Sequence, residues 1–330
     1  MIKSLQFLCA VLVLAFLSAT GAAPARAAQE GHFDKTLTVN GAVDLDVATG
    51  SGNITIHPGG AGQVQIHAII RAGNGWSSGG DVEKRIQYIE EHPPIEQDGN
   101  TITIGHEEDR DLMRNISISY DITTPAETHL HSATGSGNQT VDGIAGPVDT
   151  TTGSGDLRLS SIGAGVTARA GSGGIKLNGV KGTLRAATGS GDIRADGVTG
   201  AITASTGSGD VTLTQAGSGD VEVTTGSGTV ELNGVKGAVR IGTGSGNISA
   251  EGTPTGDWRL RTGSGDLSVT LPQQSSFELR AHTSSGSIHT AFPITMQGTI
   301  SPRDLQGKVG SGGPVLELRT SSGAIRIESK

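Results

Sequence analysis

The chain has 330 residues, of which 53 are glycine and only 3% are aromatic, and its formal net charge is −8 at pH 7. Glycine is present at more than twice its usual share of about 7%, which argues against an ordinary compact core, and the acidic balance argues against a nucleic-acid partner. Such a composition is typical of disorder or of a repeat fold with narrow turns, and only the repeat fold predicts a fixed period.

Residues 1–27 have the pattern of a secretory signal peptide. Lys3 supplies a basic start, residues 8–17 form a short apolar stretch, and small residues lead to Ala25-Arg26-Ala27. The apolar stretch is too short to span a membrane, so we predict cleavage after this segment and no membrane span in the mature chain. We therefore expect an exported protein in the periplasm, at the cell surface or secreted.

Cleavage would also remove Cys9, the only cysteine, so the mature chain would have no disulfide and no cysteine metal site. Its stability would then come from packing and backbone hydrogen bonds. Loss of Lys3 and Arg26 lowers the basic count from 24 to 22 against 32 acidic residues, which makes the mature net charge −10.

Residues 28–134 are predicted to form irregular first repeats with a capping helix. Val82, Ile86 and Ile89 follow helical spacing and prolines end the pattern at 93–94, which predicts an amphipathic helix over residues 81–91. We expect this helix to cover the N-terminal end of the array, because exposed strand edges need caps. Alternating apolar residues predict strands at 43–47, 53–56, 64–70, 101–104 and 116–122.

Residues 135–290 form the regular array, which is marked by a Gly-Ser-Gly triplet about every 18 residues. An additional triplet at Gly217 falls near the middle of one step. Stacked strands require such a period, since each strand aligns with its equivalent in the preceding repeat. The main triplets begin at Gly135, Gly153, Gly171, Gly189, Gly207, Gly226, Gly244 and Gly263.

Each repeat contains two short alternating apolar segments, such as Ile193/Ala195 and Ile202/Ala204, nine residues apart. This pattern predicts an all-β fold: a single-stranded parallel β-solenoid, or β-helix, with two strands and two turns in each rung of about 18 residues. A left-handed hexapeptide helix also has 18 residues per coil, but it needs an aliphatic residue every six, which the spacing of nine fits poorly.

The triplets are interpreted as turns, in which glycine would supply the positive φ angles of a sharp reversal. Residues 291–330 are predicted to hold a loop excursion at 292–308 and a last degenerate rung at 310–330. Asp or Asn follows most triplets and is predicted to cap backbone amides; these residues are Asn53, Asn138, Asp156, Asp192, Asp210, Asp220, Asn247 and Asp266.

Four features occur together in this chain: the Thr-Gly-Ser-Gly-Asp units, the predicted signal peptide, the irregular first strands with a short helix, and the closing Ser-Ser-Gly-Ala-Ile-Arg-Ile at 321–327. In this layout the chain resembles the bacterial putative-adhesin β-strand repeat family of uncharacterised exported proteins, over residues 33–329. The resemblance implies a β-solenoid at or outside the cell envelope.

A column of aspartates is also a possible calcium site. The calcium-binding nonapeptide, however, places its Asp two residues before the buried aliphatic residue, whereas Asp192 directly precedes Ile193. Gly174 and Thr229 interrupt the column, so turn capping is favoured, and we expect no metal or cofactor. His129 and His131 lie on one side of a strand and could form half of a metal site, but no third ligand is evident from their spacing.

The outward positions of the strands provide the candidate binding site. Arg158, Lys176 and Arg194 recur at steps of 18 residues and would stack as a column of cations on an acidic protein, which favours a polyanion such as an acidic glycan. The alternative is that these charges keep the strand face soluble. The next outward residues, Thr212, Glu222 and Glu231, do not continue the cationic run.

No catalytic constellation is present. The triplet serines recur as turn residues and lack the Gly-x-Ser-x-Gly pattern of a nucleophile. We therefore expect a non-enzymatic adhesin or envelope scaffold that presents a β-surface to a cell-surface glycan or envelope protein. The alternative is a carbohydrate-active β-helix enzyme, similar to pectate lyases, but Trp76 and Trp258, the only tryptophans, lie in no acidic cluster.

Overall fold

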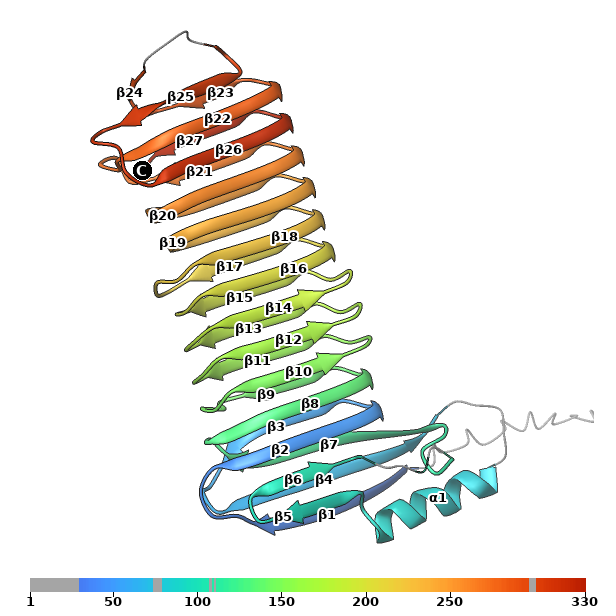
Figure 1. Cartoon of the computed structure of the whole chain (residues 1–330). Coiled ribbons are helices and arrows are strands. Elements are labelled where there is room, and N and C mark those ends of the chain that lie inside the picture. The colour runs from blue at the N-terminus through green and yellow to red at the C-terminus, as the bar shows by residue number, and fades with distance from the viewer. Residues whose placement is uncertain (1–29, 74–78, 107–108, 110, 297–300) are drawn as a thin grey trace, which may run out of the picture.

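The computed structural model describes residues 30–73, 79–106, 109, 111–296 and 301–330. The predicted signal segment at 1–27 and Trp76 lie outside the described residues. Within the described part there are 27 strands and one helix, so the all-β expectation is confirmed. The strands stack into a rod, and the helix lies beside its N-terminal end (Figure 1).

The N-terminal part contains the predicted helix, α1 (Gly79–Glu91), and all of the predicted strands. The strands are β1 (Glu30–Thr38), β2 (Val43–Ser51), β3 (Ile54–Gly59), β4 (Gln63–Ala72), β5 (Ile95–Asp98), β6 (Thr101–Ile104) and β7 (Ile116–Pro125). Only β1 and β5 were not predicted. β1 pairs antiparallel with β4, and β5 pairs antiparallel with β6.

The regular part consists of two rows of parallel strands. Row A comprises β8, β10, β12, β14, β16, β18 and the later halves of β19 and β20; row B comprises β9, β11, β13, β15, β17, the earlier halves of β19 and β20, and β21. Their bounds are β8 (Thr128–Ser136), β9 (Gln139–Asp142), β10 (Val148–Thr152), β11 (Leu157–Ile162), β12 (Val166–Ala170), β13 (Ile175–Val180), β14 (Leu184–Thr188), β15 (Ile193–Val198), β16 (Ile202–Ser208), β17 (Val211–Gln215), β18 (Val221–Ser227), β19 (Val230–Ser245), β20 (Ile248–Ser264) and β21 (Leu267–Leu271).

Strands that are neighbours within a row come from successive repeats. Leu157 aligns with Ile175, and Ile175 aligns with Ile193, so the register follows the 18-residue period of the sequence. Side chains alternate between buried and outward positions along each strand. The buried side chains of both rows join one continuous hydrophobic cluster, which holds the rows together.

In the triplet at 153–155, the glycines are required by close stacking of the turns rather than by positive φ angles. A Cβ added to Gly153 would lie 2.5 Å from the carbonyl oxygen of Gly135 in the preceding repeat, and one on Gly155 would overlap the carbonyl oxygen of Gly137. Neither Gly153 nor Gly155 has a φ in the left-handed region. The expectation of positive φ is therefore wrong for this triplet, but it holds for the third glycine of others, such as Gly228 (φ 152°) and Gly246 (φ 149°). At the opposite turn, Gly179 also has a left-handed φ (72°).

Most triplets are preceded by a threonine whose side chain lies on the buried side of the turn. Thr152 Oγ1 donates a hydrogen bond to the carbonyl oxygen of Gly137 at 3.0 Å, and Thr206 Oγ1 donates to that of Gly191 at 2.9 Å. Both threonines are almost fully buried. Each of these two hydroxyls thus satisfies a carbonyl of the preceding repeat, which explains why most of the sequence units begin with Thr.

At the C-terminal end, the last strands in the sequence are not the last in space. β26 lies between β20 and β22, and β27 lies between β21 and β23. The predicted loop at 292–308 contains two strands, of which β25 pairs antiparallel with β22. The elements here are β22 (Phe277–Ser285), β23 (Ile288–Thr290), β24 (Ile294–Thr295), β25 (Asp304–Val309), β26 (Val315–Ser322) and β27 (Ile325–Ser329).

The N-terminal end has a similar arrangement. β2 lies between β6 and β8, and β3 lies between β7 and β9. The helix α1 packs on β1 and β4 through its buried face, which carries Val82, Ile86 and Ile89 as predicted. The backbone N–H of His32 donates to Glu90 at 2.8 Å and ties β1 to the helix.

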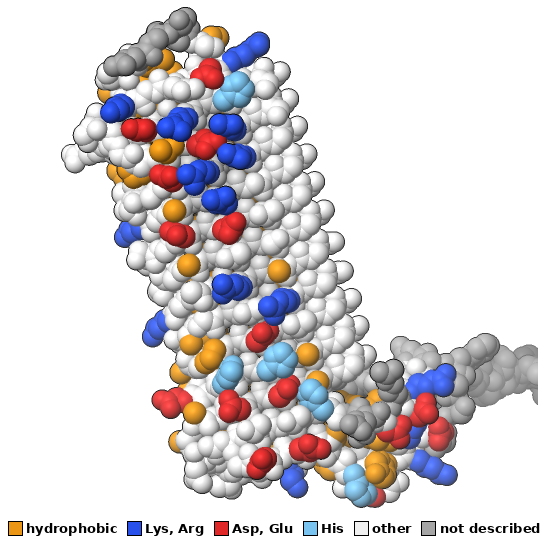
Figure 2. All heavy atoms as spheres, in the orientation of Figure 1, with side chains coloured by type: hydrophobic (Ala, Val, Ile, Leu, Met, Phe, Trp, Pro, Cys, Tyr) orange, Lys and Arg blue, Asp and Glu red, His pale blue; other side chains and the backbone are white. Residues whose placement is uncertain are grey.

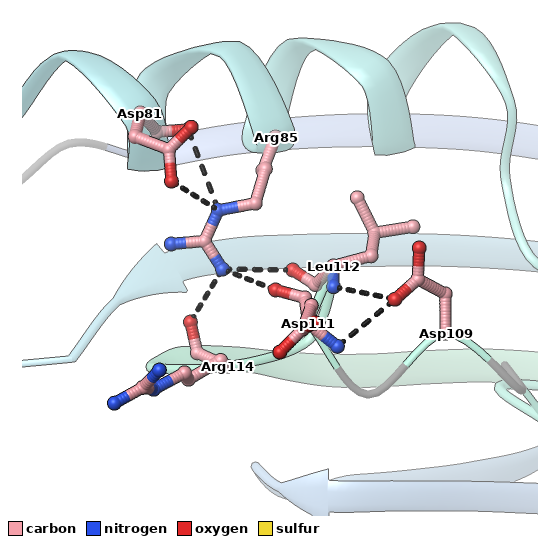
Figure 3. A network of polar contacts seen from close by, with 6 residues as sticks. All are labelled: Asp81, Arg85, Asp109, Asp111, Leu112 and Arg114. Atoms are coloured by element: carbon pink, nitrogen blue, oxygen red, sulfur yellow. Dashed lines mark hydrogen bonds and ion pairs between the residues drawn. The ribbon is translucent and has the colours of Figure 1, made fainter.

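Arg85 connects α1 to the loop that precedes β7 (Figure 3). Its Nη1 donates to the carbonyl oxygens of Asp111, Leu112 and Arg114 at 2.8, 3.1 and 2.7 Å. Asp109 supports the same loop by accepting the backbone N–H of Asp111 at 2.9 Å. One side chain of the helix thus organises a loop that carries no secondary structure of its own.

Candidate functional site

The predicted cationic column is assembled in row B. Arg158 on β11 aligns with Lys176 on β13, which aligns with Arg194 on β15. All three side chains point outward between buried neighbours and line one groove of about 480 Å³. Neighbouring strands lie about 4.8 Å apart, so the groove presents a cation at each of three successive steps along the rod.

Aspartates line the other side of this groove, and each caps the next repeat. Asp156 Oδ1 accepts the backbone N–H of Gly174 at 3.0 Å, Asp192 Oδ1 accepts that of Asp210 at 2.9 Å, and Asp210 Oδ1 accepts that of Thr229 at 2.7 Å. The turn-capping interpretation is therefore confirmed. The capped amide belongs to the following repeat, so the column also joins successive repeats.

Only the first cation of the column is neutralised. Arg158 Nη2 lies 2.8 Å from Asp156 Oδ2, whereas neither Lys176 nor Arg194 has an acidic side chain within ion-pair distance in the part of the chain that the structure describes. Lys176 lacks such a partner because Gly174 occupies the aspartate position of its own repeat. The groove therefore contains two adjacent exposed cations that form no ion pair within the described residues, although carboxylates also line the groove.

The same groove becomes acidic at its far end. Arg194 aligns with Thr212, and Thr212 aligns with Glu231, which also lines the groove. As the sequence indicated, the cationic run ends there. A ligand that lay along the whole groove would meet cations first and a carboxylate last.

The histidine pair does not form a metal site. His129 Nδ1 lies 3.3 Å from Asp44 Oδ1, and His131 aligns with Asp46 on the neighbouring strand. The described residues contain no group of three or more His, Cys, Asp or Glu that could hold a metal ion. Trp258 is fully buried and donates through Nε1 to the carbonyl oxygen of Gly237 at 2.9 Å, so it offers no stacking surface to a sugar.

A second charged cluster was not predicted from the sequence. Glu317 on β26 lies 2.8 Å from Arg261 Nη2, 2.8 Å from Arg319 Nε and 3.7 Å from Arg259 Nε. Burial alone would raise the pKa of Glu317, but the hydrogen bond from Arg261 and the three positive charges outweigh it and hold this pKa below its ordinary value. Sequence spacing could not show the cluster, because β26 is inserted beside β20.

Figure 2 shows a face on which basic side chains gather toward the C-terminal end, with acidic side chains between them. Toward the N-terminal end of the same view, histidine and acidic side chains dominate. On this face, the charges are therefore segregated along the length of the rod rather than spread evenly.

The Toastrack DUF4097 family model matches residues 38–218 and 188–328. A crystal structure of a "putative adhesin" from Bacteroides fragilis NCTC 9343 shares 13% identity over 90% of this chain and 97% of its own, with a TM-score of 0.36. One of a "putative cell adhesion protein" from Clostridium sporogenes ATCC 15579 shares 14% over 91% and 100%, with a TM-score of 0.22. No curated protein matches. Within the described residues, no helix is long and apolar enough to cross a membrane.

Proposed function

Because the chain belongs to the Toastrack DUF4097 family, we propose that it is an exported, non-enzymatic β-solenoid of the adhesin type that holds an acidic polysaccharide in the groove of Arg158, Lys176 and Arg194. The family match confirms the resemblance noted in the sequence and assigns no ligand. The observation that carries the ligand class is the adjacent pair of cations, Lys176 and Arg194, which lack acidic partners in the described chain and face one groove.

In this proposal, rows A and B are the two sides of a parallel solenoid with about 18 residues per rung. The alignment of Leu157 with Ile175 in row B and of Val166 with Leu184 in row A supports this interpretation. A surface built this way repeats at a constant spacing, which suits a ligand that is itself a repeating polymer.

The two sides of the groove suit the two kinds of polar group on an acidic sugar. Carboxylates or ester anions of the polymer would accept hydrogen bonds from Lys176 and Arg194. Asp192 and Asp210 each use one oxygen to cap a backbone amide, and their second oxygens remain available to accept hydrogen bonds from sugar hydroxyls. These carboxylates repel any anion, but a sugar acid also brings hydroxyl donors that they can accept, which a simple inorganic anion lacks.

Binding would be distributed over several repeats. Each exposed charge contact contributes on the order of 1 kcal/mol or less, so affinity would come from simultaneous contacts along the polymer. Because the aspartates of the groove act as turn caps in several repeats, they support a binding role rather than an acid–base pair unique to one site. Short oligosaccharides should therefore bind much more weakly than long ones.

The test compares polygalacturonate with neutral dextran by isothermal titration calorimetry on the mature chain. The double variant K176E/R194E should lose at least about tenfold in affinity for polygalacturonate, since two attractive contacts become repulsive. Arg185→Glu is the matched control, because Arg185 is an exposed row A residue that lies between Lys176 and Arg194 in the sequence. The control should bind almost as well as the original protein.

Two results would overturn the proposal. Equal binding by K176E/R194E and the Arg185→Glu control would remove the groove as the site. Release of new reducing ends from polygalacturonate would show turnover and favour the carbohydrate-active enzyme instead. Export is tested separately, by sequencing the N-terminus of the protein from the cell envelope; a mature start at residue 28 is expected.

A further inference from the structure

Five arginines occupy outward positions on neighbouring strands of the row A face near the C-terminal end. Arg240 aligns with Arg259, and Arg259 aligns with Glu317, which aligns with Arg280. In the adjacent column, Arg261 aligns with Arg319. This cluster lies on the part of Figure 2 where basic side chains gather.

The acidic residues nearby neutralise only part of this charge. Glu317 lies among Arg259, Arg261 and Arg319, and Asp257 Oδ2 accepts a hydrogen bond from Arg259 Nη2 at 2.8 Å. Arg240 has no ion pair or hydrogen bond within the described residues. A guanidinium carries five N–H donors, so these contacts also leave donors free on Arg259 and Arg261.

A notch opens beside these free donors at Gly242. In the same outward column, the neighbouring strands carry Ser205, Thr224, Arg261 and Arg319, whereas β19 carries no side chain at this point. A Cβ added to Gly242 would meet no atom within 4 Å. The missing side chain leaves a hollow of about 220 Å³ that is lined by Arg240, Arg259, Arg261 and Thr224.

We propose that this notch is a second binding site, specific for a tetrahedral oxyanion such as a phosphate or sulfate group. The planar donor forks of Arg240, Arg259 and Arg261 converge on it from two columns, and such forks match the oxygens of phosphate and sulfate. The hydroxyl of Thr224 adds a donor at the rim. No carboxylate lines this hollow, in contrast to the row B groove, so a compact anion of high charge meets no repulsion from within it.

Glu317 is a positioning residue in this site. It fixes Arg261 and Arg319 through ion pairs at 2.8 Å and does not line the hollow. Two arginines so close together would otherwise repel each other. The buried carboxylate of Glu317 offsets this repulsion, so the cluster can form. Its contact with Arg261 also fixes the orientation of that guanidinium, whose other N–H donors stay free.

The notch is independent of the proposed polysaccharide groove, because the two lie on different rows and share no residue. An oxyanion could reach it as a free ion or as an ester group on a polymer. Loss of polygalacturonate binding in K176E/R194E should leave the notch intact, so failure of one proposal does not imply failure of the other.

The decisive variant is Gly242→Thr, which fills the notch and keeps every arginine. Thr suits an extended strand position where nothing opposes its Cβ, so the variant should fold with an unchanged or higher unfolding temperature. Ser205→Thr is the matched control, because it adds one methyl group in the same column two strands away. A second variant, Arg240→Gln, removes the unpaired cation without changing the fold.

Binding is measured by calorimetry with inorganic phosphate, inorganic sulfate, dextran sulfate and a polyphosphate, at constant ionic strength. Gly242→Thr and Arg240→Gln should each weaken binding of the preferred oxyanion at least about tenfold, while Ser205→Thr binds normally. A preference for the polymers identifies an ester-bearing ligand, and equal binding identifies the free ion. Equal affinities for the original protein and Gly242→Thr, or no binding of any of the four probes, would overturn the proposal.

Discussion

At the scale of single residues, the first glycine of each triplet is constrained by the repeat before it. Gly153 stacks on Gly135 so closely that a methyl group would collide with a backbone carbonyl, and this carbonyl cannot move without disturbing its own repeat. Gly50, at the same triplet position in the first such turn, has no atom within 4 Å of an added Cβ. The same motif position therefore excludes a Cβ in one repeat and has room for it in another.

We expect Gly153→Ala to destabilise the protein by about 1–3 kcal/mol through overpacking. Gly50→Ala should be neutral or stabilising by up to about 1 kcal/mol, since it only reduces the freedom of the unfolded chain. Thermal unfolding followed by circular dichroism measures both variants. Equal midpoints for the two would show that stacking does not set the glycine requirement.

Glu317 gives the protein a specific pH dependence. Its pKa is lower in the folded state than the ordinary value of 4.5, so its stabilising contribution is complete above that value and is lost as the pH falls through the folded-state pKa. Glu317→Gln should therefore cost about 2 kcal/mol at pH 7 and progressively less as the pH falls below 4. Unfolding temperatures measured from pH 7 to pH 3 test this.

Glu222→Gln is the control for Glu317→Gln, because Glu222 lies in the same outward column, is exposed and has no ion pair within the described residues. Its unfolding temperature should match that of the original protein at every pH. A constant difference between Glu317→Gln and the original protein down to pH 3 would contradict the role assigned to the arginine cluster.

Much of the residue-level chemistry could be predicted from the sequence where it depends on the period. The alignment of Arg158, Lys176 and Arg194 follows directly from their spacing, and so does the capping column. The alignment of Thr224, Gly242 and Arg261 also follows the period, but the notch itself could not be predicted, because it depends on the space that the neighbouring side chains leave. Glu317 was missed for a similar reason, since its partners lie 56 or more residues away on β20, apart from Arg319.

At the scale of elements, α1 acts as a support for the loop before β7. Arg85 alone supplies donors to three carbonyl oxygens of that loop, and its side chain is only 18% exposed. Loops without regular hydrogen bonds depend on such contacts to satisfy their backbone. The helix was predicted from its apolar face, but this polar function of its other side was not evident from the pattern.

Arg85→Ala should loosen the segment from Asp111 to Arg114 while the helix itself persists. We expect the amide hydrogens of this segment to exchange with solvent at least about tenfold faster, since each lost hydrogen bond is worth about 1 kcal/mol. Lys84→Ala, at an exposed position of the same helix, is the control and should leave the exchange unchanged. Hydrogen exchange with mass spectrometry resolves the two cases, and equal rates would show that Arg85 does not hold the loop.

At the scale of the whole molecule, the order of repeats along the rod differs from their order along the chain at both ends. Leu316 and Leu318 on β26 have the same alternation as Leu279 and Ala281 on β22, so either strand could follow β20 by pattern alone. Short alternating strands in a sequence show the period of the repeat, but they do not show which strands lie side by side. For this reason the sequence predicted a last repeat at 310–330 and could not place it inside the end of the rod.

Removal of residues 314–330 should detach β22 and β25 from the rest of the rod, because β26 is the strand that joins β22 to β20. We expect the amides of β22 to lose their protection from hydrogen exchange, while those of β12 and β14 in the middle of the rod stay protected. Addition of a peptide with the sequence of residues 314–330 should restore the protection. Unchanged protection of β22 in the shortened chain would contradict this arrangement.

The inserted position of β26 and β27 also has a consequence for the timing of folding. A chain that is synthesised and exported from its N-terminus can fold its regular repeats one after another, because each repeat stacks on a neighbour that has already folded. The strands β22 and β23 are synthesised before the strands that they pair with, because β26 and β27 are formed by residues 315–329. The C-terminal end of the rod therefore folds only after β26 and β27 have been made. A chain that stops before them leaves β22 and β23 unpaired, and quality-control proteases could recognise these exposed strands.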